Sequence, residues 1–353
     1  MADGADVDLA FVFLSSAHLD EAEAAAEAIR AELAPRHQLG CVAEGVLARR
    51  REVEDGPAVA VWAGALPGAE IECFHATADP IEGGIVVRGF PELDDPGLVA
   101  LLVDPFTFPA GPFLSRLNET HERIPLVGGI APGGGRPGMQ ALILEDAVHA
   151  EGAVGAVVSG PPVVTVVSQG CRPIGREAVI TRCDGNVVHE LAGRPALDRL
   201  RNEIAALTPK EQALAARGLL AGLVIDENRP EYDTGDFLMR GLVGADETTG
   251  ALALGDRVRV GQTLRFFIRD AVSADADLRR ALRNRPRHAE GALLFTCNGR
   301  GTNMFSETSH DARVVAEALG TQALAGFFCG GEIGPVGGKA FLHGFTATLA
   351  VFG

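Results

Sequence analysis

A chain of 353 residues with 47% hydrophobic and 22% charged residues can bury a large core, which excludes a disordered protein. Its formal net charge of −16, from 47 acidic and 31 basic residues, repels phosphate backbones and anionic lipids, so we expect neither nucleic acid nor a membrane surface as a partner. The 44 glycines and 20 prolines are scattered without a period, which excludes a collagen-like chain.

The amino-terminal residues and the cysteines indicate a compartment. Residues 1–6 are acidic and lack the basic and apolar stretches of a secretory signal, and no apolar run approaches the roughly 20 residues that a membrane helix needs. The six cysteines are scattered and form no CxxC pair, a usage typical of reduced cysteines in a core. The sequence therefore predicts a cytoplasmic protein, and its richness in alanine, glycine and arginine indicates a GC-rich, bacterial genome.

Three stretches of the chain follow one order: an amphipathic helix, a short apolar strand and a glycine-rich turn. The change of apolar period along each stretch predicts the helix and the strand, and the glycines mark backbone that needs a positive φ or a close approach. We expect the three stretches to form an internal structural repeat. The helices and the strand-turn segments are residues 19–33 and 38–45, residues 113–123 and 124–129, and residues 311–319 and 323–332.

Apolar, β-branched runs separated by short turns fill much of the remaining chain and favour antiparallel hairpins over βαβ crossovers. Residues 195–205 and 209–216 have helical patterns, and Thr208, followed by Pro209 and Glu211, marks a helix start. A helix is also expected at residues 274–283, and residues 341–352 predict one closing strand. The other predicted strands are residues 7–14, 58–63, 84–88, 98–103, 140–144, 153–159, 163–168, 262–269 and 291–297.

These elements predict the fold class α+β, with large mixed, mainly antiparallel β-sheets flanked by helices and two related halves. We expect an amino-terminal domain at residues 7–195, a helical connection at residues 196–217 and a carboxyl-terminal domain at residues 218–353. Because the connection carries no Gly/Ser-rich or Pro-rich stretch, we expect the two halves to share an interface.

Motifs along nearly the whole chain resemble those of the FIST family, whose members carry FIST N-terminal and FIST C-terminal domains. Each motif alone is weakly specific, and their order and completeness make the resemblance strong. The motifs are GCVAEG at residues 40–45, PAVAVW at 57–62, PLVGG at 125–129, QGCRPIG at 169–175, FLMRGLVG at 237–244, GQTLRF at 261–266, CNGRG at 297–301 and GFFCGGEIGP at 326–335.

The resemblance implies a cytoplasmic sensory module that binds a small ligand, such as an amino acid or a small carboxylate. Since relatives are often fused to signalling outputs, we expect this chain to signal through a separate partner protein. Some relatives bind haem and sense nitric oxide, so a non-covalent haem-binding nitric oxide sensor is an alternative. A third hypothesis is an enzyme that uses a cysteine or an acidic residue. The sequence contains no recognisable catalytic motif, and we expect binding rather than catalysis.

The turns that end the apolar strands carry the candidate ligand contacts. Arg300 lies between two glycines, and its guanidinium can hold a carboxylate with two parallel hydrogen bonds; the alternative is a structural pair with an acid or a backbone carbonyl. Glu332 can hold an amino group or pair with Arg300, and Glu44 occupies the corresponding turn of the first repeat. The predicted ligand-binding residues are Arg300, Glu332, Gly299, Gly301, Cys329, Glu44, Gly128 and Gly129.

A dinucleotide-binding pattern and three candidate cysteine nucleophiles each lack a feature that their function requires. The GxGxxG pattern at residues 133–138 is followed by a strand-like run rather than a helix, which disfavours a dinucleotide site. Cys41, Cys297 and Cys329 lie at strand ends beside glycine turns, but a nucleophilic cysteine needs a neighbouring base and a lowered pKa. We expect these three cysteines to line a core or a pocket.

Metal and haem sites receive little support from residue spacing. Cys171, Cys183 and His189 match no common zinc pattern, so we expect no metal ligands. No CxxCH motif is present, which excludes covalent haem attachment. His121 and His310, at the edges of predicted helices, are the candidate axial ligands for non-covalent haem.

Overall fold

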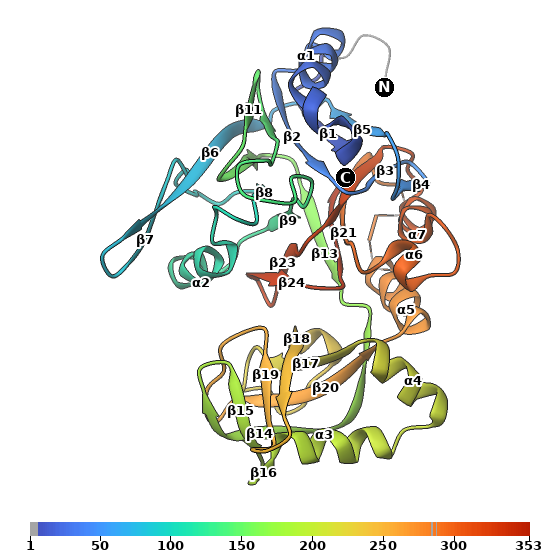
Figure 1. The fold of residues 1–353 in the computed structure, drawn as a ribbon. Helices are drawn as coiled ribbons and strands as arrows, with labels where there is room; N and C mark the ends of the chain where they lie inside the picture. The colour runs from blue at the N-terminus through green and yellow to red at the C-terminus, as the bar shows by residue number, and fades with distance from the viewer. Residues whose placement is uncertain (1–5, 284, 287) are drawn as a thin grey trace. The chain divides into compact units, whose positions relative to one another are not determined.

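The computed structural model describes residues 6–283, 285–286 and 288–353 and confirms the predicted class (Figure 1): an α+β protein with mixed, mainly antiparallel sheets flanked by helices. The chain forms two compact units. The first unit comprises residues 1–168 and 279–353, and the second comprises residues 169–278. The chain therefore leaves the first unit, completes the second and returns.

The first unit contains three repeats of one strand order, which confirms the repeat predicted from the sequence. Each repeat has a strand, a helix, a second strand parallel to the first, a β-hairpin and a last strand antiparallel to the first. The first repeat comprises β1 (Leu9–Ser15), η1 (Ser16–Glu21), α1 (Ala22–Leu33), β2 (His37–Ala43), β3 (Val46–Ala48), β4 (Arg51–Val53) and β5 (Val59–Gly64). The second comprises β8 (Leu98–Val103), α2 (Ala110–Thr120), β9 (Leu126–Ile130), β10 (Leu142–Leu144), β11 (Ala147–His149) and β12 (Ala153–Ser159). The third comprises β21 (Gly291–Cys297), α6 (Gly301–Met304), α7 (His310–Leu319), β22 (Leu324–Cys329), β23 (Glu332–Val336), β24 (Lys339–His343) and β25 (Ala347–Phe352).

The hairpin of each repeat joins the sheet of another repeat. The β3–β4 hairpin pairs with β22, the β10–β11 hairpin with β2, and the β23–β24 hairpin with β9. The strands β6 (Glu70–Ile81) and β7 (Gly84–Arg88) extend the sheet of β12, and β13 (Val163–Ser168) extends the sheet of β25. Because the hairpins are exchanged in this cyclic way, no sheet of the first unit can be completed by one repeat alone.

One glycine occupies the same position in the parallel pair of each repeat. Gly40, Gly128 and Gly326 lie opposite Val12, Leu101 and Leu294 on the neighbouring strand. A Cβ atom added to these glycines would lie 1.8, 1.9 and 1.7 Å from the carbonyl oxygens of those partners. The glycines therefore permit a backbone approach that any side chain would prevent.

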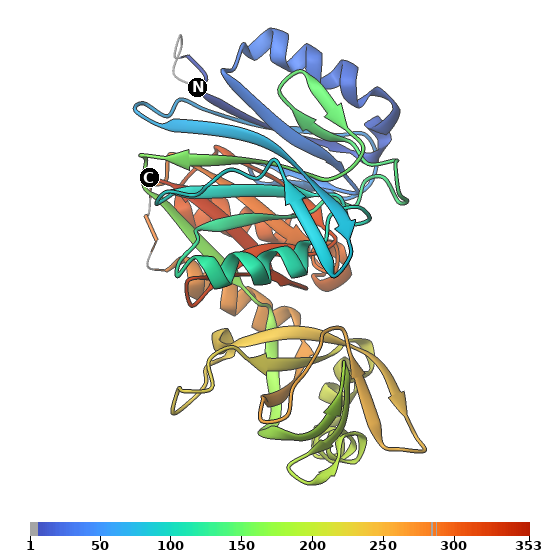
Figure 2. The same ribbon diagram turned by 90° about the vertical axis from the view of Figure 1, so that its left-hand side faces the viewer.

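The first strand of each repeat (β1, β8 and β21) is buried on both faces, which explains its continuous apolar run. Phe13 points into a shared core between the sheets, where its ring centroid lies 5.3 Å from that of Phe327 and 6.4 Å from that of Phe295. The alternate residues Val12 and Leu14 pack beneath α1, which covers the outer face of the sheet (Figure 2). Each strand thus contributes to two apolar layers.

Two details differ from the sequence-based expectations. The single strand expected at residues 341–352 is wrong: it is two strands, β24 and β25, separated by a turn in which Phe345 has φ +64°. The long strand β6 was not predicted, since its half-exposed residues mix charged and apolar side chains and give no clear apolar face. Strand pairing, rather than local pattern, defines β6.

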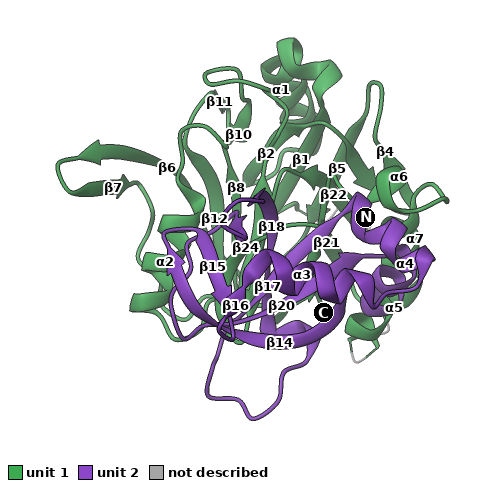
Figure 3. Ribbon diagram, turned by 60° about the horizontal axis from the view of Figure 1, so that its bottom comes forward, with its two compact units in different colours: residues 1–168, 279–353 green, residues 169–278 purple. Residues whose placement is uncertain are grey.

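The second unit is an antiparallel β-barrel, coloured purple in Figure 3. Its strand order is β14-β20-β17-β18-β19-β15, and pairing of β15 with β14 closes the ring. Closure leaves no open edge among these six strands. The elements are β14 (Cys171–Asp184), β15 (Val187–Leu191), β16 (Arg194–Pro195), β17 (Leu219–Val224), η2 (Thr234–Asp236), β18 (Phe237–Asp246), β19 (Ala251–Leu254) and β20 (Thr263–Arg269).

The helices α3 (Ala196–Ala205) and α4 (Pro209–Arg217) lie within the second unit, where their apolar side chains join the barrel core. The predicted start of α4 is confirmed: Thr208 and Glu211 form a reciprocal capping box. The helix α5 (Ala271–Leu282) carries the chain back into the first unit. None of the helices in the described ranges is both long and apolar enough to span a membrane.

Candidate functional site

The turn after β21 follows a fully buried strand and folds against an acidic side chain. Gly301 has φ +50°, and a Cβ atom on it would lie 2.5 Å from a carboxylate oxygen of Glu54. The backbone N–H of Thr302 donates to both Glu54 oxygens, at 3.0 and 3.1 Å. Glycine is required here because of both the backbone conformation and the closeness of Glu54.

Arg300 in this turn is completely buried and has a partner within the chain. Its Nε and Nη2 donate to the two Asp311 oxygens at 2.7 and 2.8 Å, while its guanidinium lies 5.3 Å from the Phe305 ring centroid. Burial alone would raise the pKa of Asp311, but the charge and hydrogen bonds of Arg300 outweigh it and hold that pKa well below its usual range. The remaining Nη1 has no hydrogen-bond partner among the described residues. Contact of Arg300 with a ligand stays a prediction.

Glu332 begins β23 and is also completely buried. Its Oε2 accepts hydrogen bonds from the Thr346 N–H at 3.0 Å and from the Thr346 hydroxyl at 2.7 Å. Burial raises the pKa of Glu332 to about 8, although Thr346, the Cys297 thiol and the charge of Arg300 all act in the opposite direction. Glu332 is therefore mostly protonated at neutral pH and is a neutral hydrogen-bonding group rather than an anion.

Segments far apart in the sequence meet around these two residues. Gly129 of β9 pairs with Glu332, and a Cβ atom on Gly129 would lie 2.3 Å from the Cys329 sulfur. The Asn298 amide donates to Glu44 Oε2 at 2.7 Å, and Glu44, unlike Glu332, is exposed. The structure thus places all eight sequence-predicted contacts at one end of the first unit. We refer to Glu44, Cys297, Arg300, Asp311 and Glu332 together as the Arg300 cluster.

The cysteines at this end, Cys41, Cys297 and Cys329, are buried free thiols. Burial raises the pKa of Cys297 to about 12 and raises the pKa values of Cys41 and Cys329 well above their usual range. The neighbouring Glu332 carboxyl acts in the same direction on Cys297 and Cys329. A thiol with a raised pKa is a poor nucleophile, so these residues have the character of core cysteines.

The two histidines considered for haem have local partners. His310 stacks on Phe305 at a centroid distance of 3.6 Å, and its Nδ1 lies 2.9 Å from Asp311 Oδ1. The Nδ1 of His121 lies 2.9 Å from the Thr120 hydroxyl. His310 therefore belongs to the surroundings of the Arg300–Asp311 pair, which fixes its ring.

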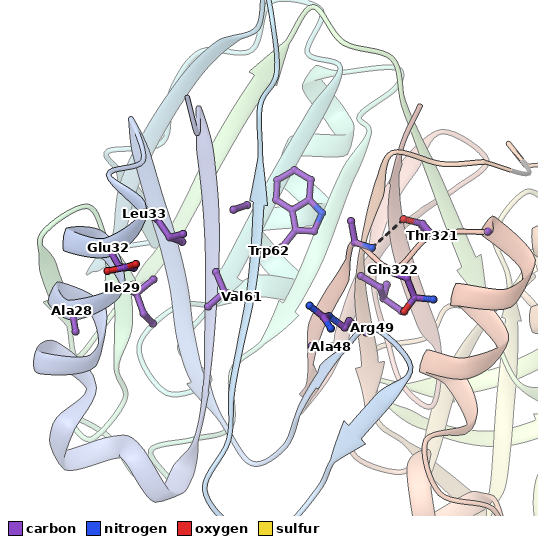
Figure 4. Close-up of a pocket in the computed structure, with 14 residues that line it drawn as sticks. Ala28, Ile29, Glu32, Leu33, Ala48, Arg49, Val61, Trp62, Thr321 and Gln322 are labelled. Carbon is purple, nitrogen blue, oxygen red and sulfur yellow. Dashed lines mark hydrogen bonds between the residues drawn. The ribbon is translucent and has the colours of Figure 1, made fainter. Parts of the chain in front are cut away.

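An open pocket lies at the other end of the strands of the first unit, between α1, β5 and the segment that enters β22 (Figure 4). Its volume is about 810 Å³. Figure 4 shows Glu32 on α1 at one side and Arg49 at the other, with Trp62 between them. We call it the Trp62 pocket, and its lining residues are Ala28, Ile29, Glu32, Leu33, Ala48, Arg49, Val61, Trp62, Ala63, Gly320, Thr321, Gln322, Ala323 and Leu324.

The charged side chains of the Trp62 pocket, Arg49 and Glu32, are not neutralised by an ion pair within the described ranges. Arg49 has φ +57°, and its N–H donates to the Leu324 carbonyl at 2.7 Å. In the described part of the chain, neither Arg49 nor Glu32 forms a side-chain ion pair, and both are exposed. The pocket therefore presents a positive and a negative group to solvent on opposite walls.

A second cavity of about 380 Å³ shares Trp62, Ala63 and Ala323 with the pocket. Trp62 is only 5% exposed and stacks on Phe352 with ring centroids 4.7 Å apart. Its indole Nε1 faces Gly291, which lines the second cavity, and finds no acceptor among the described residues. Buried indole N–H groups usually have a hydrogen-bond partner, so this donor is available to a ligand acceptor or a water.

Sequence reasoning missed the Trp62 pocket. Its lining residues come from four separate stretches, and no motif joins them. Arg49 reads as one member of an arginine run, residues 49–51, that resembles a solvated surface. The single tryptophan of the chain was the one available signal, because aromatic side chains are common in the lining of small-molecule pockets.

Comparison with known proteins identifies the family of the chain. Residues 8–194 match the FIST N domain, and residues 196–335 match the FIST C domain. The uncharacterized protein Rv0628c of Mycobacterium tuberculosis (strain ATCC 25618 / H37Rv) is 45% identical over 349 residues, covering 98% of this chain and 91% of that protein. The uncharacterized protein Mb0898c of Mycobacterium bovis (strain ATCC BAA-935 / AF2122/97) is 43% identical, covering 98% and 90%. FIST domains are generally sensory domains, and this chain belongs to the FIST family.

Proposed function

We propose that this FIST protein is a sensor that binds an amino acid or a small carboxylate in the Trp62 pocket. The observation that carries the proposal is an open pocket of about 810 Å³ with unpaired opposite charges, Glu32 and Arg49, on opposite walls. Pockets of roughly 300–1,000 Å³ with a few convergent polar groups are typical of small-molecule sites. Both charges belong to the first unit, so the site needs no contribution from the barrel.

The lining suits a ligand with a carboxylate. The exposed Arg49 guanidinium can hold a carboxylate with two parallel hydrogen bonds, and Glu32 can accept from an ammonium group. Val61, Leu33 and the Trp62 ring provide an apolar surface for the rest of the ligand. Arg49 provides a positive centre on one wall of the site in a chain whose net charge is −16, and an anionic group can pair with it.

We propose binding rather than catalysis, supported by the raised pKa values of the three buried cysteines at the opposite end of the strands. We also propose that the sensor acts in the cytoplasm and passes its signal to a separate protein. The sensory character of FIST domains supports the proposal that a separate protein receives the signal. Cross-linking in cells, with and without the identified ligand, tests it by asking whether a partner is captured in a ligand-dependent way.

A thermal-shift screen of amino acids and small carboxylates identifies the ligand, because a ligand that binds the folded state raises its stability by mass action. The affinity of the best compound is then measured for the parent, for Arg49→Ala and for the matched control Arg51→Ala. Arg51 is an exposed arginine two residues away that does not line the pocket. We expect Arg49→Ala to weaken binding by about 1.5–3 kcal/mol, the usual scale for hydrogen bonds to a charged group.

Equal affinities of the Arg49→Ala variant and the parent would place the ligand elsewhere. Arg300, through its unpaired Nη1, is the next candidate contact, and Arg300→Lys tests it because the change removes Nη1 while keeping a positive charge near Asp311. Failure of every compound in the screen to raise the melting temperature would contradict the proposed ligand class.

A further inference from the structure

Three side chains that can bind a metal ion converge on another face of the first unit. His37 begins β2, Cys73 lies in β6, and Glu145 lies in the turn between β10 and β11. One possible ligand atom from each of the three lies within 4.8 Å of the others. The residues are far apart in the sequence, so the cluster exists only because the β10–β11 hairpin is paired with the sheet of the first repeat.

Glu145 is held in an uncommon backbone conformation that aims its carboxylate. It has φ +54°, and its N–H donates to the Gln38 carbonyl at 2.7 Å. Its Oε2 accepts hydrogen bonds from Arg30 Nη1 at 3.0 Å and from the Gln38 N–H at 3.3 Å. These contacts leave Oε1 directed at His37 Nδ1, 2.8 Å away. A non-glycine residue with a positive φ, fixed by several contacts, is a feature that often accompanies function.

The three donor types indicate which ion fits. Imidazole nitrogen, thiolate sulfur and carboxylate oxygen together are the ligands of zinc, whereas magnesium and calcium prefer oxygen alone. We propose that His37, Cys73 and Glu145 bind a zinc ion, with Glu145 Oε2 oriented by Arg30 and a water molecule at the fourth position. The side chains of His37 and Glu145 are 33% and 29% exposed, so solvent can reach the ion.

Zinc binding changes the protonation of the cluster in a defined way. His37 binds through the Nδ1 lone pair and keeps its proton on Nε2, and the Cys73 thiol loses its proton to solvent. When His37 is neutral beforehand, binding of one ion therefore releases one proton, from Cys73. Burial, followed by the charge of Glu145, raises the pKa of Cys73 to about 12, and the ion offsets this cost by stabilising the thiolate.

The groups around the cluster allow the ion to bind. Arg30 is the cation in contact with it, and it pairs with the Glu145 oxygen that does not face His37. Two residues along β6 from Cys73, His75 stacks on His149 of β11 with ring centroids 3.9 Å apart. Burial, with a contribution from His75, lowers the pKa of His149, so this neighbouring histidine adds no positive charge at neutral pH. Metal–ligand distances of about 2.0–2.3 Å require the three donors to move closer together than they are without the ion.

The ion would join two sheets of the first unit. The strand β6 belongs to the sheet of β8 and β12, while β2 and the β10–β11 hairpin belong to the sheet of β1. A metal held by ligands from both sheets stabilises the folded state by mass action. Zinc should therefore raise the melting temperature as well as bind.

The test is a titration of the metal-free full-length protein with Co²⁺, followed by competition with Zn²⁺. A thiolate ligand gives Co²⁺ a charge-transfer absorption band that a protein without a cysteine ligand cannot give. The variants Cys73→Ser, His37→Gln and Glu145→Gln are compared with the controls Cys183→Ser and His149→Gln. Cys183 is a half-buried free cysteine of the barrel, and His149 is the histidine of the neighbouring stack. Circular dichroism verifies that each variant is folded.

We expect one Co²⁺ per chain with a thiolate band, full displacement by Zn²⁺ and a zinc-dependent rise in the melting temperature. The band should vanish in Cys73→Ser, and affinity should fall at least tenfold in His37→Gln and Glu145→Gln while both controls retain it. Absence of a stoichiometric band in the parent, or an equal loss in the controls, overturns the proposal. If a ligand variant does not fold, the parent is alkylated with and without zinc, and mass spectrometry measures the labelling of Cys73. Zinc should protect Cys73 from alkylation. Equal labelling of Cys73 with and without zinc overturns the proposal.

Discussion

The Arg300 cluster and the Trp62 pocket are built on the same strands of the first unit, and they treat charge in opposite ways. The cluster follows the carboxyl ends of β21 and β22, where Arg300, Asp311 and Glu332 are completely or almost completely buried. Arg300 and Asp311 bond to each other, and Glu332 accepts hydrogen bonds from Thr346. The pocket precedes β22 and adjoins β5, and its charged residues, Glu32 and Arg49, are exposed and have no side-chain ion-pair partner within the described ranges.

This difference separates charges that stabilise the fold from charges that are open to a ligand. A buried charge must be compensated inside the chain, because an uncompensated one costs several kcal/mol. Arg300 meets that demand with Asp311 and thereby loses most of its capacity to bind a ligand. Charges at a solvent-filled pocket cost little when unpaired, so they are available for a ligand. A charged residue in a glycine-rich turn at a strand end can therefore form either a structural pair or a ligand contact. Its burial decides which of the two it forms.

The largest expected effect is on the Arg300–Asp311 pair. Arg300→Met keeps the side-chain volume but leaves Asp311 buried without its partner, and it should lower the free energy of unfolding by about 3–5 kcal/mol. Urea unfolding followed by circular dichroism measures the change. The double variant Arg300→Met/Asp311→Leu should recover much of the loss, because it removes both charges. A single variant as stable as the parent would show that the pair is not a structural clasp.

A second, intermediate effect concerns pH and Glu332. Because folding raises the pKa of Glu332 to about 8 from an ordinary value of 4.5, its stabilising contribution is complete below pH 4.5 and is lost as the pH rises through 8. Glu332→Gln keeps a neutral side chain at every pH. At pH 9 the variant should exceed the parent in stability, by on the order of 2–4 kcal/mol, and the gain should disappear near pH 5. Unfolding curves at the two pH values measure it; a difference independent of pH contradicts the buried neutral acid.

The smallest expected effects belong to the pocket. Glu32→Gln should change stability by less than about 0.5 kcal/mol, as is usual for an exposed residue, yet weaken binding of an amino acid by about 1–2 kcal/mol. Binding of a simple carboxylate that lacks an ammonium group should be unchanged or slightly tighter. Glu23→Gln, an exposed change on the same helix outside the pocket, is the control. Calorimetric titration with the amino acid and with the simple carboxylate measures the two affinities. If Glu32→Gln weakens the binding of both compounds equally, Glu32 does not contact the ammonium group.

Much of the fold was predictable because short apolar runs bounded by turn residues mark many of the strands. The strands at residues 84–88, 98–103, 153–159, 163–168 and 291–297 begin and end as predicted. Their apolar runs are continuous, and turn residues bound them. The convergence of the glycine-rich turns was predictable for the same reason, since each turn follows a strand of the same repeated unit.

Long-range pairing could not be predicted from local pattern. The hairpin exchange between repeats brings Glu145 to His37 and Leu324 to Arg49, although no local pattern links these segments. The partner of Arg300 is Asp311, only eleven positions along the chain. Sequence alone left that structural pair and a ligand contact as alternatives, because it does not reveal burial. The expected domain boundaries at residues 195 and 217 stay predictions, whereas the compact units of the structure divide after residues 168 and 278.

Ligand binding beside Trp62 has a direct reporter, because Trp62 is the only tryptophan in the chain. The measurement is a titration of intrinsic tryptophan fluorescence with the compound that most raises the melting temperature. We predict a saturable change in Trp62 emission, with a dissociation constant equal to that from calorimetry, and a weaker apparent affinity for Arg49→Ala. A compound that binds stoichiometrically by calorimetry yet leaves both Trp62 emission and its quenching by acrylamide unchanged would contradict the account.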